Sequence, residues 1–386
     1  MLKSPVYLDY NSTTPVDERV LDVMFPYFTT KFGNAASKTH SYGWIAEDAI
    51  KQAREQIANL INAEEEEIIF TSGATEAINL ALKGVYDIYK VKGNHIITVT
   101  TEHSAVLDTC KTLEKKGAVI TYLSVDREGM IDIQELKNAI TAQTILISVM
   151  YANNETGVTQ QMRPIAELAH EKGIIFMSDA TQAVGKIRVD VIEDGIDLLC
   201  LSAHKIYGPK GVGALYVRRK NPKVRLASQI DGGGHERGLR SGTLNVPGIV
   251  GLGKACEIAG TEMWDDAKRI STLRTQLEHA FIDNLGNVFV NGSQKYRIPN
   301  VTNLSFQGVK ADTLITALKD IALATGSACS SASMEPSHVL KAMGLSDELS
   351  YSSIRFSLGK YTSEEEIVYA ISKISEAILN LRKINL

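Results

Sequence analysis

The sequence is poor in cysteine and tryptophan, and it contains no long uncharged apolar run. Its 386 residues include 4 Cys and 2 Trp, and no two Cys form a CxxC pair. So few cysteines cannot build a disulfide framework or a zinc ribbon, and they are typical of a reducing compartment. The longest apolar stretch, residues 145–152, falls far short of the roughly 20 residues that cross a bilayer.

The sequence also lacks an excess of charge of either sign and an apolar segment at its start. It has 41 basic and 45 acidic residues, a net charge of -4, so its composition predicts no nucleic-acid partner. The opening residues, MLKSPVYLDYN, lack the apolar core of a secretory signal. We therefore expect a cytoplasmic protein that does not associate with membranes. Its length allows two or three domains with a sizeable core.

Short apolar runs rich in β-branched residues alternate with segments of helical period between about residues 65 and 217. Strands buried on both faces and separated by helices have this pattern, which is typical of a mostly parallel sheet. The sequence thus predicts an α/β fold with a seven-stranded sheet. The expected strands are 68–71, 95–98, 119–123, 144–150, 174–178, 198–202 and 214–217.

The pattern changes beyond about Thr261. A long amphipathic helix is expected at 264–285, followed by short strands near Val288 and at 302–306 and a terminal helix at 363–382. We therefore predict a large α/β domain at 16–260. A smaller α+β domain would combine residues 1–15 with residues 261–386.

A lysine and an aspartate follow two of the predicted strands. The strand at 198–202 leads to Lys205 in a glycine-rich turn, and the strand at 174–178 leads to Asp179. Taken singly, Lys205 would be a surface lysine and Asp179 a helix N-cap. Together they suit pyridoxal phosphate, because a lysine forms its Schiff base and a carboxylate keeps its pyridine nitrogen protonated.

Further polar residues follow other strands. Ser72, Gly73, Ala74 and Thr75 stand between a strand and a helix, where backbone N–H groups and a helix dipole favour phosphate. His103 and Asn154 follow two more strands, and polar groups at such strand ends converge on one ligand site. A dinucleotide or ATP site is disfavoured, since GPKGVG is not GxGxxG and GLGKA lacks the Walker spacing.

Cys329 is the candidate reactive thiol. It stands among small and hydroxylated residues in TGSACSSASMEPSHVL, whereas Cys110, Cys200 and Cys256 lie in apolar strand or helix patterns and should be buried. The alternative to a reactive Cys329 is that it is an inert thiol in a loop. Beside a lysine-bound cofactor, a reactive thiolate favours sulfur chemistry, in which it attacks the sulfur of an amino acid and becomes a persulfide.

These motifs resemble those of the cysteine desulfurases, a family of the fold-type I, class V pyridoxal phosphate enzymes. The matching segments cover nearly the whole chain and include YLDYNSTTPVD, FTSGATEAINLALKG, SDATQAVGK, SAHKIYGPKG, GGGHERGLRSGTLN and GSACSSASMEP. The segment around Cys329 is similar to the long-loop group. The resemblance implies conversion of L-cysteine to L-alanine with a persulfide on Cys329, which supplies sulfur for iron-sulfur cluster assembly and tRNA thiolation.

The resemblance also implies roles for the cofactor-binding residues. Lys205 would hold the cofactor and move the substrate Cα proton, and Asp179 would pair with the pyridine nitrogen. His103 would stack on the ring and assist proton transfer, and Gln182 would reach the ring hydroxyl. The phosphate would be bound by Ala74, Thr75, Ser202 and His204, together with Thr243 from the other subunit of a homodimer.

The substrate and the partners follow from the same resemblance. Arg355 would clasp the carboxylate of L-cysteine through its fork of N–H groups, with help from Asn34 and Asn154. No resident metal is expected, although Cys329 would transiently ligate a cluster on an iron-sulfur scaffold protein. Other sulfur acceptors are also implied.

Two departures from the family pattern stand out. Ala35 replaces a usual proline, and the chain ends at Leu386, where housekeeping bacterial members continue with a scaffold-docking tail. Scaffold docking is therefore left open. The alternative functions are a class V aminotransferase, a selenocysteine lyase and a non-enzymatic sulfur-trafficking protein.

Overall fold

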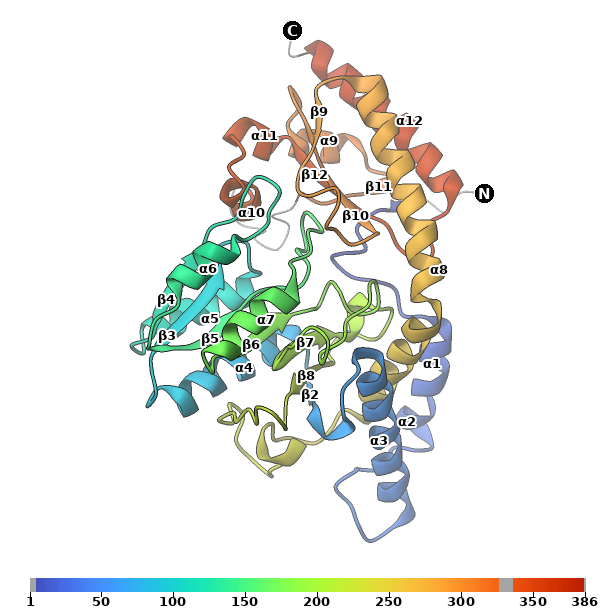
Figure 1. The fold of residues 1–386 in the computed structure, drawn as a ribbon. Helices are drawn as coiled ribbons and strands as arrows, with labels where there is room; N and C mark the ends of the chain where they lie inside the picture. Colours follow the sequence, from blue (N-terminus) through green and yellow to red (C-terminus); the bar gives the residue numbers. More distant parts are fainter. Residues whose placement is uncertain (1–4, 326–335, 385–386) are drawn as a thin grey trace.

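A computed structural model describes residues 5–325 and 336–384. Its central sheet has seven strands in the order β2-β8-β7-β6-β5-β3-β4 (Figure 1). β8 pairs antiparallel with β2 and β7, and the other neighbours pair parallel. The strands are β2 (Ile68–Thr71), β3 (His95–Val99), β4 (Val119–Leu123), β5 (Thr144–Ser148), β6 (Ile175–Asp179), β7 (Leu198–Ser202) and β8 (Gly213–Val217). The predicted α/β class and mostly parallel sheet are confirmed.

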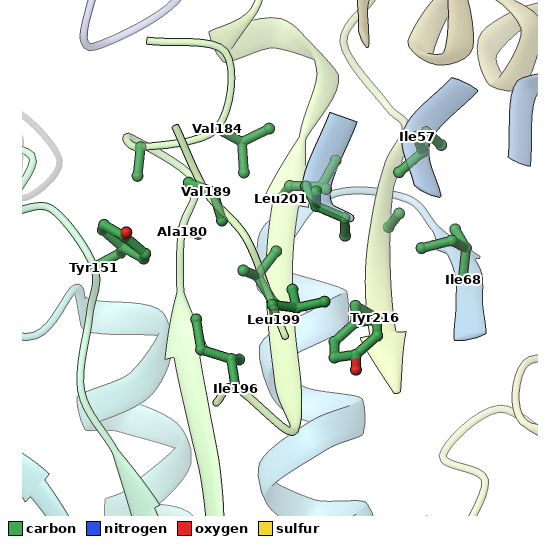
Figure 2. Packing of buried hydrophobic residues seen from close by; sticks show 14 of the residues in the cluster. Ile57, Ile68, Tyr151, Ala180, Val184, Val189, Ile196, Leu199, Leu201 and Tyr216 are labelled. Atoms are coloured by element: carbon green, nitrogen blue, oxygen red, sulfur yellow. The ribbon is translucent and has the colours of Figure 1, made fainter. Parts of the chain in front are cut away.

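Both faces of this sheet are covered. Leu199 and Leu201 of β7 belong to one apolar cluster, shown in Figure 2, while Leu198 and Cys200 belong to a second cluster on the opposite face. Successive strand residues point to opposite faces, so two covered faces require the unbroken apolar runs seen in the sequence. The helices here are α1 (Glu18–Met24), α2 (Pro26–Thr29), α3 (Ser41–Ile61), α4 (Ala74–Tyr89), α5 (Ser104–Glu114), α6 (Ile133–Ala139) and α7 (Met162–Glu171).

The C-terminal part forms a second unit with its own apolar cluster. An antiparallel sheet runs in the order β12-β10-β9, and β1 (Val6–Tyr7) near the N-terminus pairs parallel with β11. Its elements are α8 (Val246–Leu285), β9 (Val288–Val290), β10 (Val301–Phe306), α9 (Ala311–Ala317), β11 (Ile321–Ala322), α10 (His338–Ala342), α11 (Asp347–Tyr351), β12 (Ser353–Ser357) and α12 (Glu364–Ile384).

Helix α8 begins well before the predicted residue 264. Asn245 caps it by accepting a hydrogen bond from the Gly248 N–H, and the helix then continues through a glycine-rich stretch to Leu285. Glycine is a poor helix former, which hid this segment from sequence analysis. Figure 1 shows α8 running from beside α1 and α3 to α12, so it crosses residue 261 without a break. The division into domains stays a prediction.

Gly253 of α8 allows close helix packing. A Cβ on Gly253 would lie 2.6 Å from the Ala53 Cα of α3, closer than two such atoms can approach. No helix within residues 5–325 and 336–384 combines the length and apolar character needed to span a bilayer.

Candidate active site

A cavity of about 610 Å³ lies where strands of the large sheet end. Twelve residues singled out from the sequence line it, although they are scattered from residue 72 to residue 355. They are Ser72, Gly73, Ala74, Thr75, His103, Asn154, Asp179, Gln182, Ser202, His204, Lys205 and Arg355. Parallel strands carry their carboxyl ends to one edge of the sheet, so this convergence follows from the topology.

Two predicted site residues that the structure describes, Asn34 and Thr243, do not line this cavity. Asn34 is exposed in a loop, where its side chain accepts a hydrogen bond from the Ala36 N–H at 2.9 Å. Thr243 is also exposed and does not line the cavity of its own chain. Cys329 lies outside the described residues. The other three cysteines are buried as predicted.

Lys205 lies in a short 3-10 turn, Ala203–Lys205, directly after β7. Its Nζ donates hydrogen bonds to the backbone carbonyls of Asn11, at 2.5 Å, and Ser12, at 2.8 Å. The N-terminal segment therefore orients the lysine in the cavity. Periodicity and strand-end reasoning missed this segment, because its contacts to Lys205 use backbone carbonyls and leave no side-chain signal.

Asp179 is the last residue of β6, the strand next to β7. Its Oδ1 accepts hydrogen bonds from the Thr181 N–H at 3.0 Å and the Thr181 hydroxyl at 2.5 Å. The carboxylate thus makes a capping turn and also lines the cavity. The capping interpretation and the ligand-binding interpretation of Asp179 are both compatible with this position.

His103 caps α5, with its Nδ1 accepting a hydrogen bond from the Ala105 N–H at 3.1 Å. Burial lowers the pKa of the imidazole, and the nearby charge of Asp179 opposes this only in part. A neutral ring whose Nδ1 accepts a hydrogen bond carries its proton on Nε2. His103 can therefore present a flat face and one N–H donor.

One end of the cavity is suited to an anion. Helix α4 starts at Ala74 without a side-chain cap, so the N–H groups of its first turn lack the usual acceptor. Gly73, before it, has a φ of 154° and permits close backbone approach. Burial lowers the pKa of His204 to about 4, with the charge of Lys205 adding to the effect, so the ring is a neutral donor.

Arg355, on β12, brings the second unit to the cavity. Its guanidinium donates hydrogen bonds to Asp9 Oδ1 and Ser12 Oγ, both at 2.7 Å, and to the Asn154 carbonyl at 3.0 Å. The residue is 3% exposed, and its Nε has no hydrogen-bond partner in the described part of the chain. Arg355 is therefore held rigidly and keeps a donor for a further acceptor.

The cavity also includes residues that strand-end reasoning did not select. They are Asn11, Ser12, Thr13, Glu76, Thr181, Lys210 and Gly211, besides Ile78, Met150 and Ala152. Asn11 to Thr13 lie in YLDYNSTTPVD and Lys210 in SAHKIYGPKG, so similarity to the family motifs was the one signal that could have found them.

The aminotransferase class-V family matches residues 6–369. This chain belongs to that family. Within it, two similar relatives are named cysteine desulfurase IscS. The protein from Proteus mirabilis is 55% identical over 386 residues, and that from Anaeromyxobacter dehalogenans is 53% identical over 384 residues. Both matches cover 100% of this chain and 95% of the relative.

Solved structures agree with these matches. A structure titled NifS-like protein has a TM-score of 0.90 at 39% identity, covering 97% of this chain and 99% of the other. One titled SspA in complex with cysteine has a TM-score of 0.82 at 39% identity, covering 93% of this chain and 100% of the other. The predicted family and the predicted fold class are therefore confirmed.

Proposed function

We propose that this chain is a cysteine desulfurase that uses pyridoxal phosphate to remove the sulfur of L-cysteine and release L-alanine. The activity agrees with the names of full-length relatives at more than 50% identity. One observation carries the proposed chemistry: Asp179 ends β6, Lys205 lies in the turn after the neighbouring strand β7, and both line the same cavity.

The cavity fits the cofactor in size and in the placement of its polar groups. A volume of about 610 Å³ is in the range of small-molecule sites. Asp179 would pair with the pyridine nitrogen and Lys205 would hold the aldehyde carbon. The uncapped start of α4, with Thr75, Ser202 and His204, would bind the phosphate. When bound, pyridoxal phosphate supplies an electron sink that makes the Cα–H bond of an amino acid acidic.

The residues around Lys205 prepare it to act as a base. Carbonyl oxygens of Asn11 and Ser12 orient its amine, and His103 contributes a neutral ring for stacking and proton transfer. Arg355 would bind the substrate carboxylate, helped by Asn154 and by Asn34 from its exposed loop. In this arrangement Lys205 would take the proton from Cα while the carboxylate stays held.

Cys329 would be the sulfur acceptor. Its thiolate would form a bond to the substrate sulfur while the Cβ–S bond breaks, and the electron pair of that bond would stay with the carbon fragment, which takes up a proton. Burial raises the pKa of Cys110 to about 12 and that of Cys200 well above its usual value, so these buried thiols are poor nucleophiles.

The residues that flank the segment containing Cys329 contact the site. The Arg355 N–H donates to the Ala324 carbonyl at 2.9 Å, and the Ser337 hydroxyl donates to Glu155 Oε2 at 2.5 Å. One end of the segment is therefore joined to Arg355, which lines the cavity, and the other end to Glu155, the neighbour in sequence of the cavity residue Asn154. These connections support the role proposed for Cys329.

The proposed partners are L-cysteine, a second copy of the chain and protein acceptors of sulfur. In the homodimer the exposed Thr243 would reach the phosphate site of the other subunit. An iron-sulfur scaffold and tRNA-thiolation proteins would be acceptors in the cytoplasm. We retain the proposed division into a large domain at 16–260 and a small domain at 1–15 and 261–386.

A spectrum followed by product analysis tests the function. We expect near-visible absorbance from the bound cofactor that is lost in Lys205→Ala, and alanine formation after L-cysteine is added. Amino-group transfer to a keto acid without sulfide formation would indicate an aminotransferase instead. Faster turnover of selenocysteine than of cysteine would indicate a selenocysteine lyase. Binding of a sulfur donor without turnover would indicate a sulfur-trafficking protein.

A further inference from the structure

Lys186 is a lysine that does not line the cavity but contacts two residues that do, Asn11 and Gln182. Neither strand-end reasoning nor the family resemblance gave it a role. It follows Gln182 by four residues in the turns after β6. Its Nζ donates to Gln182 Oε1 at 2.5 Å and to Asn11 Oδ1 at 3.3 Å. Burial lowers the pKa of this amine well below its usual value, with the charges of Lys205 and Arg355 adding to the effect.

Asn11 joins Lys186 to the catalytic lysine. Its backbone carbonyl accepts hydrogen bonds from Lys205 Nζ at 2.5 Å and from Gln182 Nε2 at 2.9 Å. Its side-chain oxygen accepts from Lys186 and from Asn300 Nδ2, at 3.0 Å. The side chains of Lys205, Gln182 and Lys186 are therefore tied to one buried residue, which is 1% exposed.

The orientation of the Gln182 amide follows from its two partners. A carbonyl oxygen only accepts hydrogen bonds, so the Asn11 carbonyl requires the NH₂ end of the amide. An amine in either protonation state has at least two N–H groups, and here they match the two amide oxygens of Gln182 and Asn11. Both contacts select the same orientation, in which the second N–H of Gln182 is left for a ligand in the cavity.

We propose that Lys186 is a positioning residue that holds the Gln182 amide with its N–H donor toward the cofactor. Without Lys186, Oε1 would lose its donor, and the Asn11 carbonyl alone would oppose rotation of the amide to present an acceptor. The ring hydroxyl of pyridoxal phosphate is an anionic acceptor when deprotonated, and a hydrogen-bond donor stabilises that form. The inference rests on the proposed function, because Gln182 matters in this way only if the cavity holds the cofactor.

Cofactor affinity and absorbance test this role without measuring turnover. In Lys186→Met we expect the affinity of the apoprotein for pyridoxal phosphate to fall about fivefold to tenfold, the scale of one ordinary hydrogen bond, and the near-visible band to shift. In a Gln182→Met background the same change should add little, because Lys186 acts through Gln182. Full additivity of the two changes would overturn the proposal.

Lys360→Met is a matched control. Lys360 is also a partly buried lysine, but it pairs with Asp17 and Glu262 away from the cavity, so its loss should leave the absorbance band unchanged. Gln182→Glu supplies a test that does not depend on the folding of Lys186→Met. It keeps the contact to Lys186 but removes the N–H donor, so cofactor affinity should fall while the protein stays folded.

Two outcomes are distinguishable. A wild-type protein that binds no pyridoxal phosphate would contradict the proposed function. A wild-type protein that binds it, together with unchanged affinity and absorbance in Lys186→Met or unchanged affinity in Gln182→Glu, would contradict the inference alone.

Discussion

The Arg240 Nε donates a hydrogen bond to Glu76 Oε1 at 2.9 Å, and this bond joins the segment that contains Thr243 to the first turn of α4. Glu76 also accepts a hydrogen bond from the Ser72 N–H at 2.8 Å. Burial alone would raise the pKa of Glu76, but these hydrogen bonds lower it, so the carboxylate is charged beside the proposed phosphate site. Arg240 therefore offsets the negative charge of Glu76 at the site where the phosphate of the cofactor is expected to bind.

Loss of Arg240 should weaken cofactor binding. In Arg240→Met the Glu76 carboxylate would repel the phosphate, and we expect the affinity for pyridoxal phosphate to fall about tenfold. Adding Glu76→Gln should restore most of that affinity, because it removes the unpaired charge. Titration of the apoprotein with cofactor gives both values. Arg163→Met, which breaks an exposed pair with Glu167, is the control and should have no effect.

Loss of the proposed acceptor thiol should separate cofactor binding from sulfur transfer. In Cys329→Ala the near-visible absorbance should remain, while alanine and sulfide formation falls by roughly a thousandfold or more, as expected for an essential nucleophile. Cys256→Ala is the control, since that thiol is buried and should not take part in turnover. Normal turnover in Cys329→Ala would refute the assignment of the nucleophile.

Acid should weaken the ionic cluster that joins α1 to α8. Hydrogen bonds from Arg19 and Lys360 lower the pKa of Glu262 to about 2, so the folded protein binds this proton less readily than the unfolded chain. The stability that ionised Glu262 contributes is fully present above about pH 4.3, the pKa of a glutamate in the unfolded chain. It is lost as the pH falls toward 2. Thermal unfolding from pH 6 to pH 2.5 should be less acid-sensitive in Glu262→Gln. An unchanged pH profile would argue against this role.

Two glycines of α8 should respond to alanine in opposite directions. Gly253→Ala places a Cβ against the backbone of α3, so we expect the free energy of unfolding to fall by about 1–3 kcal/mol despite better helix propensity. At Gly260 the nearest atom would be Leu60 Cδ1 at 3.8 Å, so Gly260→Ala should stabilise the helix by about 0.5–1 kcal/mol. Chemical denaturation measures both. Equal changes in the free energy of unfolding for the two variants would show that close packing against α3 does not determine the need for glycine at position 253.

Sequence analysis located the sheet well because each strand carries its own signal. The predicted bounds 68–71, 119–123 and 198–202 agree with β2, β4 and β7, and the residues of β2 and β7 are buried on both faces. The start of α8 was missed, because the need for glycine arises from contact with α3 and not from local propensity.

The sequence by itself determined the family, the α/β sheet and the residue types at the strand ends, since these depend on local patterns and motifs. Only the tertiary structure decided that Asn11 holds Lys205, Gln182 and Lys186 together, and that Asp9 and Ser12 hold Arg355 at the cavity. The physical reason is that hydrogen bonds between residues more than 170 positions apart depend on how the chain returns to one place.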